Sequence, residues 1–221
     1  NLSLYMLEAV PDDADCLIIN APATDLSSDD ADKILAYLEK GGSALITESA
    51  IDVEKPNLDR VLEYYGVGLS RGMVIEQDSS HYFNPYIYYL APDKQQHDIM
   101  SDLIKNRSNL FIPFSEAVVK LDSARSTVKF EPLLVTTDNS FLRVLENSAS
   151  QSISKEEGDI DGPFNVAVAV SEEHNDVETR LVVFGTFYIT EDSANANVNG
   201  NNYQMVASSL NWLAQMDSSI A

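Results

Sequence analysis

The stretch from Val10 to Thr47 constrains the fold more than any other part of the chain. It contains two continuous apolar runs, at 16–19 and 44–47, separated by a polar loop and a segment with helical periodicity. A continuous apolar run is typical of a strand buried on both faces, as in a parallel sheet. Short links between strand, helix and strand favour a right-handed parallel crossover. The stretch therefore predicts a β-α-β unit.

The helix of this unit has a defined start, face and end. Ser27 or Ser28 can cap it, and aspartates follow in its first turn, where they favour the positive end of the helix dipole. Gly41-Gly42 supplies the left-handed residue that commonly ends a helix. The apolar residues recur on one face, at Ala31, Ile34, Leu35 and Leu38.

The rest of the chain continues the alternation and then becomes richer in strands. A second helix is predicted from Asn57 to Gly66, followed by a strand near 69–76. Extended runs follow at 117–121, 133–137, 166–170 and 180–184, and a final amphipathic helix covers 203–214. No internal repeat or strong linker interrupts the chain, so we expect one α/β domain over residues 1–221.

Charge and cysteine content exclude several classes of protein. The chain carries 35 acidic and 14 basic residues, a formal net charge of −21, which repels phosphate backbones and anionic lipid surfaces. We therefore expect no nucleic-acid partner. Cys16 is the only cysteine, so no intrachain disulfide or cysteine metal cluster can form. The three histidines lack metal-ligand spacing, and no nucleotide-binding or nucleophile-elbow motif is present, so we expect no metal, cofactor or catalytic residue.

No apolar run approaches the roughly 18 residues of a spanning helix, and no signal peptide is visible. Because the chain begins at Asn1 rather than Met, we expect it to be an excised or processed segment of a longer protein. Membrane contact is then expected only through segments outside this chain.

Topology predicts where a ligand would bind. Open parallel sheets bind ligands beyond the carboxyl ends of their strands. Five polar residues follow the predicted strands there: Asn20, Thr24, Glu48, Ser49 and Thr186. They include one acid and no adjacent base, which suits hydrogen bonding better than nucleophilic catalysis.

The aromatic tract from Tyr82 to Leu90 allows two interpretations. It contains five aromatic residues and can form a strand that fills the core between layers. Alternatively, its rings form a surface on which sugars stack.

Several stretches, in the same order, resemble the gliding-motility-type (GldG-like) ABC transporter auxiliary proteins. The stretch "VPDDADCLIINAPATDLSSDDADKILAYLEKGGSALI" matches their pattern of Val-Pro, acidic turn, strand, proline-containing loop, acidic helix, Gly-Gly and strand. "KPNLDRVLEYYGVGLSRGMVIE" resembles the next helix and strand, and "QQHDIMSDL" is similar to a histidine-containing turn. "TRLVVFGTFYIT" with "GNNYQMVASSLNWLA" resembles the closing strand, polar loop and helix. The likeness spans about residues 10–215.

This resemblance implies a flavodoxin-like or class I glutamine-amidotransferase-like fold, a mostly parallel sheet with helices on both faces and extra strands in the second half. It also implies a domain on the extracytoplasmic face of a bacterial membrane, tethered by helices outside this chain, beside an ABC permease and ATPase. The sequence departs from the family pattern at Asp98, where proline is usual, and at Thr186, where the pattern has aspartate. The related amidotransferases carry a catalytic cysteine after a strand, and the corresponding segment "TESAID" has none.

The leading hypothesis is therefore a non-catalytic domain of an ABC transport auxiliary protein that binds a ligand or a partner protein. One alternative is a hydrolase or amidotransferase-like enzyme that uses Glu48 or His97, which adds His97 to the candidate ligand-binding residues. The other alternative is carbohydrate binding by the aromatic tract.

Overall fold

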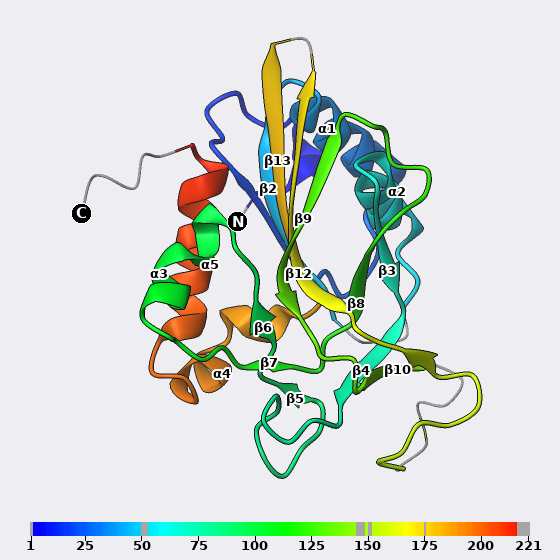
Figure 1. Ribbon diagram of the computed structural model, residues 1–221. Helices are drawn as coiled ribbons and strands as arrows, with labels where there is room; N and C mark the ends of the chain where they lie inside the picture. Colours follow the sequence, from blue (N-terminus) through cyan, green and yellow to red (C-terminus); the bar gives the residue numbers. More distant parts are fainter. Residues whose placement is uncertain (1, 50–52, 145–148, 150–151, 175, 216–221) are drawn as a thin grey trace.

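The computed structural model describes residues 2–49, 53–144, 149, 152–174 and 176–215 (Figure 1). The elements of the first half are η1 (Leu4–Met6), β1 (Leu17–Asn20), α1 (Ser28–Leu38), β2 (Ser43–Thr47), α2 (Pro56–Tyr64), β3 (Val67–Ser70), β4 (Gly72–Glu76), β5 (Tyr89–Leu90), β6 (Asp93–Lys94), η2 (Asp98–Met100) and α3 (Ser101–Lys105). Those of the second half are β7 (Ile112–Pro113), β8 (Ala117–Lys120), β9 (Val128–Val135), β10 (Ser140–Val144), β11 (Ile160–Asp161), β12 (Asn165–His174), β13 (Val177–Phe184), η4 (Phe187–Thr190), α4 (Asp192–Ala196) and α5 (Asn201–Leu213). Among these residues, none of the helices has the length and apolar character that crossing a membrane requires.

The first β-α-β unit forms as the sequence predicts. β1 pairs parallel with β2, from Leu17 opposite Ala44 to Asn20 opposite Thr47. The Ser27 side chain caps α1 by accepting a hydrogen bond from the Asp30 amide at 3.0 Å. Gly41 takes the left-handed conformation after the helix, with φ of +89°.

The main sheet is mixed, and the expected flavodoxin-like or amidotransferase-like, mostly parallel sheet is wrong. The strand order is β1-β2-β13-β12-β8-β3, with β9 also paired to β12 and β6 paired to β9. Within the described residues, only the β1–β2 and β2–β13 pairs are parallel; β12 pairs antiparallel with β13, β9 and β8. Two smaller antiparallel sheets, β11-β10-β4 and β5-β7, complete the structure.

The sheet is mixed because of the connection between β12 and β13. The two strands form a hairpin that pairs Ala167 with Phe184 at one end and His174 with Val177 at the other. A hairpin joins antiparallel strands, whereas a parallel pair needs a long crossover. Helices cover both faces of these strands, so their sequences are as continuously apolar as those of parallel strands.

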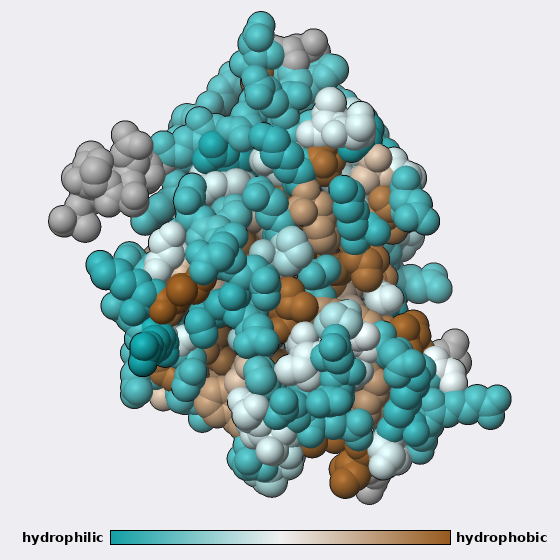
Figure 2. All heavy atoms as spheres, viewed as in Figure 1, coloured by the Kyte–Doolittle hydropathy of each residue, from teal (hydrophilic) through white to brown (hydrophobic). Residues whose placement is uncertain are grey.

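Two apolar layers lie on opposite faces of the sheet. α1 and α2 cover one face and α3 and α5 the other (Figure 1). Neighbouring residues of β13 alternate between the layers: Val182 packs in the cluster that includes Met205 of α5, and Val183 in the cluster that includes Ile34 of α1. Polar residues cover most of the surface in Figure 2, in agreement with the net charge of −21.

Candidate functional site

The carboxyl ends of β1, β2 and β13 lie side by side at one edge of the sheet. The parallel registers place Asn20, Thr47 and Phe184 together at these ends. Thr47 Oγ1 donates a hydrogen bond of 2.6 Å to Asn20 Oδ1. Thr190 Oγ1 contacts the same oxygen at 3.4 Å. The Asn20 side chain at this edge is therefore already hydrogen-bonded to two neighbouring threonines.

Glu48 is a fully buried carboxylate at this edge. Its amide donates to the Phe184 carbonyl at 3.0 Å, which continues the pairing of β2 with β13. Its side chain is 0% exposed, and Lys55 Nζ, itself on a 3% exposed side chain, lies 2.7 Å from Oε2. Arg71 Nη1 lies 3.7 Å from the same oxygen. Among the described residues, Glu48 Oε1 has no hydrogen-bond partner.

A second buried acid, Glu116, completes an ionic cluster. Arg71 Nη1 lies 3.1 Å from Glu116 Oε2, and Arg71 Nη2 lies 2.6 Å from Asp59 Oδ1. Burial raises the pKa of Glu116 to about 8, although the Arg71 guanidinium and the Lys55 ammonium oppose the shift. We call Glu48, Lys55, Asp59, Arg71 and Glu116 the ionic cluster.

The ionic cluster joins parts of the chain that are far apart in the sequence. Glu48 follows β2, Lys55 precedes α2, Arg71 lies between β3 and β4, and Glu116 precedes β8. Each cation contacts at least one carboxylate, and the two partly exposed members, Arg71 and Asp59, are 23% and 33% exposed at their side chains. Such buried pairs fix the relative positions of elements, since breaking one leaves an uncompensated charge. The arrangement is that of a structural clamp.

The other predicted residues of this edge differ in their surroundings. Thr24 is exposed and makes no hydrogen bond with the described residues, whereas Ser49 is buried next to Glu48. Thr186 is buried: its hydroxyl donates to the Pro113 carbonyl at 2.8 Å and accepts from the Tyr188 amide at 3.2 Å. The remaining residues of the segment "TESAID", 50–52, lie outside the described residues.

His97 belongs to a different part of the molecule. It lines a cavity of about 300 Å³ together with Arg180 and Trp212. Arg180 pairs with Ser43 at the start of β2, so this cavity lies at the amino end of the strands that carry Glu48 at their other end. Burial lowers the pKa of His97, whose ring packs edge-on against Trp212 at 5.2 Å between centroids. Glu48 and His97 therefore do not form one catalytic site.

The aromatic tract does not form one strand. Only Tyr89 and Leu90 belong to β5, and Tyr82 makes an isolated bridge to Leu90. Tyr88 stacks on Tyr86 on one side and on Phe114 on the other, with centroid distances of 5.5 and 5.0 Å. Because these rings cover one another's faces, the tract offers fewer free faces for a sugar than the sequence suggests.

Sequence reasoning found Glu48 and missed its partners. Lys55, Arg71 and Glu116 are 7, 23 and 68 residues further along the chain, and only the tertiary fold brings them together. One signal was present for Glu116: it directly precedes the apolar run that begins at Ala117, where a charge must find a partner.

Comparison with known proteins shows the family to which the chain belongs. The model of a family described as "ABC-type uncharacterized transport system" (ABC_transp_aux) matches residues 1–211. The chain belongs to this family, so it is an auxiliary component of an ABC-type transport system. The sequence has no significant match among the curated proteins.

A solved structure described as "mmIFT52 N-terminal domain" is similar in fold. The two chains superpose with a TM-score of 0.63 and 16% sequence identity, over 92% of this chain and 78% of the other. At this identity the likeness concerns the fold alone. It supports the mixed sheet in place of the flavodoxin-like one.

Proposed function

We propose that this chain is a non-catalytic, extracytoplasmic domain of a membrane-anchored auxiliary protein, and that it binds the permease of its ABC-type transport system. The observation that carries the proposal is the family match over residues 1–211. Assignment to the gliding-motility type, and association with a specific permease and ATPase, are predictions from the sequence resemblance.

The structure supports a binding role over a catalytic one. Catalytic acids need access to a substrate and freedom to exchange a proton. Glu48 is instead sealed from solvent and held by Lys55 at 2.7 Å, and its Arg71 contact is shared with Glu116. His97, the other candidate for catalysis, lies at the opposite end of the same strands.

Co-purification tests the proposed partners. The intact gene product, extracted from membranes in mild detergent, should carry the permease and the ATPase with it, and mass spectrometry should identify both. A matched protein that lacks residues 1–211 serves as the control for contacts made by other segments. Recovery of the intact product without any ABC subunit would refute the proposal.

Cysteine labelling tests the location. Thr24 is exposed, so the Thr24→Cys variant, in a Cys16→Ser background, should react with a membrane-impermeant maleimide in intact cells. Labelling that occurs only after the cells are lysed would place the domain on the cytoplasmic side.

A further inference from the structure

A cavity of about 300 Å³ lies between the turn that follows β4 and strand β6. No residue of the ionic cluster lines it. Its polar lining residues include Ser80, His81, Asp93, Lys94 and Asn109, and two aromatic residues, Tyr82 and Phe83, complete one side. A volume near the lower end of the range for ligand sites suits a small molecule.

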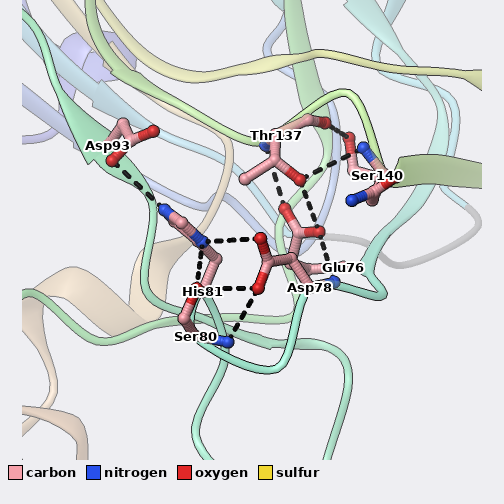
Figure 3. Close-up of polar contacts among 8 residues, drawn as sticks. Glu76, Asp78, Ser80, His81, Asp93, Thr137 and Ser140 are labelled. Carbon is pink, nitrogen blue, oxygen red and sulfur yellow. Dashed lines mark hydrogen bonds and ion pairs between the residues drawn. The ribbon is translucent and has the colours of Figure 1, made fainter.

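Hydrogen bonds hold one wall of the cavity in place (Figure 3). Asp78 accepts from the Ser80 amide at 2.9 Å and from the Ser80 hydroxyl at 2.7 Å. Glu76, buried in β4, accepts from the Asp78 amide at 2.9 Å and from the Thr137 hydroxyl at 2.8 Å. The turn is therefore anchored to the sheet before any ligand arrives, which lowers the entropic cost of binding.

The same wall places a serine, a histidine and an aspartate in sequence. Ser80 Oγ lies 2.9 Å from His81 Nδ1, and His81 Nε2 lies 3.3 Å from Asp93 Oδ1. A serine hydroxyl has one hydrogen, and Ser80 already donates it to Asp78. That hydrogen is directed at Asp78 and is not available to His81 Nδ1. The arrangement positions polar groups for binding and does not activate a nucleophile.

The cavity carries charges of both signs that do not neutralise each other. Asp93 is 63% exposed at its side chain, and its Oδ1 lies 3.3 Å from His81 Nε2. Lys94 is half-buried and, among the described residues, makes neither an ion pair nor a side-chain hydrogen bond. Lys94 therefore offers a cation that no described carboxylate neutralises.

We propose that this cavity binds a small zwitterion of amino-acid size, with its ammonium group at Asp93 and its carboxylate at Lys94. The charges in the cavity favour a zwitterion over the other classes of small ligand. A net anion is repelled by a protein of charge −21, and a simple cation leaves Lys94 without a carboxylate. A neutral sugar leaves Lys94 without a counterion and Asp93 with His81. The rings of Tyr82 and Phe83 supply an apolar surface for the remainder of the ligand.

Isothermal titration calorimetry of the 221-residue chain with each of the twenty L-amino acids tests the proposal. We expect saturable binding of at least one of them. For L-phenylalanine as an example, phenethylamine lacks the carboxylate and 3-phenylpropanoate lacks the ammonium group. The two single-charge analogues of the amino acid that binds should each bind at least about tenfold more weakly, because each leaves one cavity charge unpaired.

Variants then locate the site. Asp93→Asn and Lys94→Met should each weaken binding by about tenfold or more. The matched controls Asp102→Asn and Lys105→Met, on the exposed side of α3, should leave it unchanged. Circular dichroism spectra of the four variants check that each is folded.

Three results would overturn the proposal: no binding of any amino acid at about 10 mM, binding that both cavity variants leave intact, or binding of glucose in place of amino acids. These measurements use the isolated chain, so they stand apart from the search for a permease partner. The zwitterion site does not rest on the proposed function, and either one can fail alone.

Discussion

Replacing Lys55 by Met should destabilise the fold far more than removing an ion pair from the surface. Lys55 and Glu48 are 3% and 0% exposed at their side chains, and 2.7 Å separates their charged atoms. Loss of one partner from a buried pair costs about 3–5 kcal/mol, since the other charge stays buried without compensation. Arg71 Nη1 remains 3.7 Å from the Glu48 carboxylate and offsets part of the loss. We therefore expect a loss of about 3 kcal/mol in the free energy of unfolding.

Urea unfolding followed by circular dichroism measures this loss. With a slope of about 3 kcal/mol per molar urea, the midpoint of Lys55→Met should fall by about 1 M. The control is Arg60→Met, which removes the exposed Arg60–Asp32 pair of 2.7 Å and should cost less than about 1 kcal/mol. The double variant Glu48→Gln with Lys55→Met should recover most of the loss, because no buried charge is left without its partner. Equal midpoint shifts for Lys55→Met and Arg60→Met would refute the view that the ionic cluster is a structural clamp.

Three further predictions concern single residues. Burial raises the pKa of Glu116 from its ordinary value of 4.5 to about 8. Between these pH values the folded chain therefore binds a proton that the unfolded chain has lost. The free energy of unfolding should fall as the pH rises through this window. Glu116→Gln should flatten that decline between the urea midpoints at pH 5 and pH 9, and an unchanged decline would contradict the assignment. A Cβ atom on Gly185 would lie 2.2 Å from the Glu116 carbonyl oxygen, so Gly185→Ala should lower the urea midpoint strongly, and a wild-type midpoint would show that the close contact between Gly185 and Glu116 can open. Burial raises the pKa of the Cys16 thiol from 9.0 to about 11, so at pH 8 iodoacetamide should alkylate the folded chain roughly a hundredfold more slowly than the urea-unfolded chain, and equal rates would contradict the shift.

Local signals predicted the first part of the fold well. The cap at Ser27, the apolar face of α1 and the left-handed Gly41 depend on residues a few positions apart, so the sequence reveals them directly. The parallel pairing of β1 with β2 follows from the same unit, because its helix is too long for a hairpin and the crossover is right-handed.

The sheet as a whole could not be predicted in the same way. The runs at 166–170 and 181–184 are apolar without alternation, which indicates burial on both faces and leaves strand direction open. The link between β12 and β13 runs only from His174 to Val177, and a link this short joins antiparallel strands. The family resemblance predicts a mostly parallel sheet, and the hairpin between β12 and β13 contradicts it.

The candidate site also combines a feature that the sequence predicts with contacts that only the fold reveals. Topology placed Glu48 at the carboxyl edge, yet its role depends on Lys55 and Arg71, which no local pattern connects to it. Likewise Asp93 and His81 lie twelve residues apart on different elements, and only the fold brings them to one cavity wall. Sequence position alone does not reveal contacts of this kind.

Site-specific photocrosslinking in intact cells tests the proposed function most directly. A benzoyl-phenylalanine introduced in place of Tyr5, Tyr86 or Tyr203, three exposed aromatic residues, reports which protein touches the domain. We predict a crosslinked adduct with the permease subunit from at least one of these positions, identified by mass spectrometry. The absence of any adduct with an ABC subunit from all three positions, in cells where the co-expressed system is intact, would contradict a domain that works in contact with the transporter.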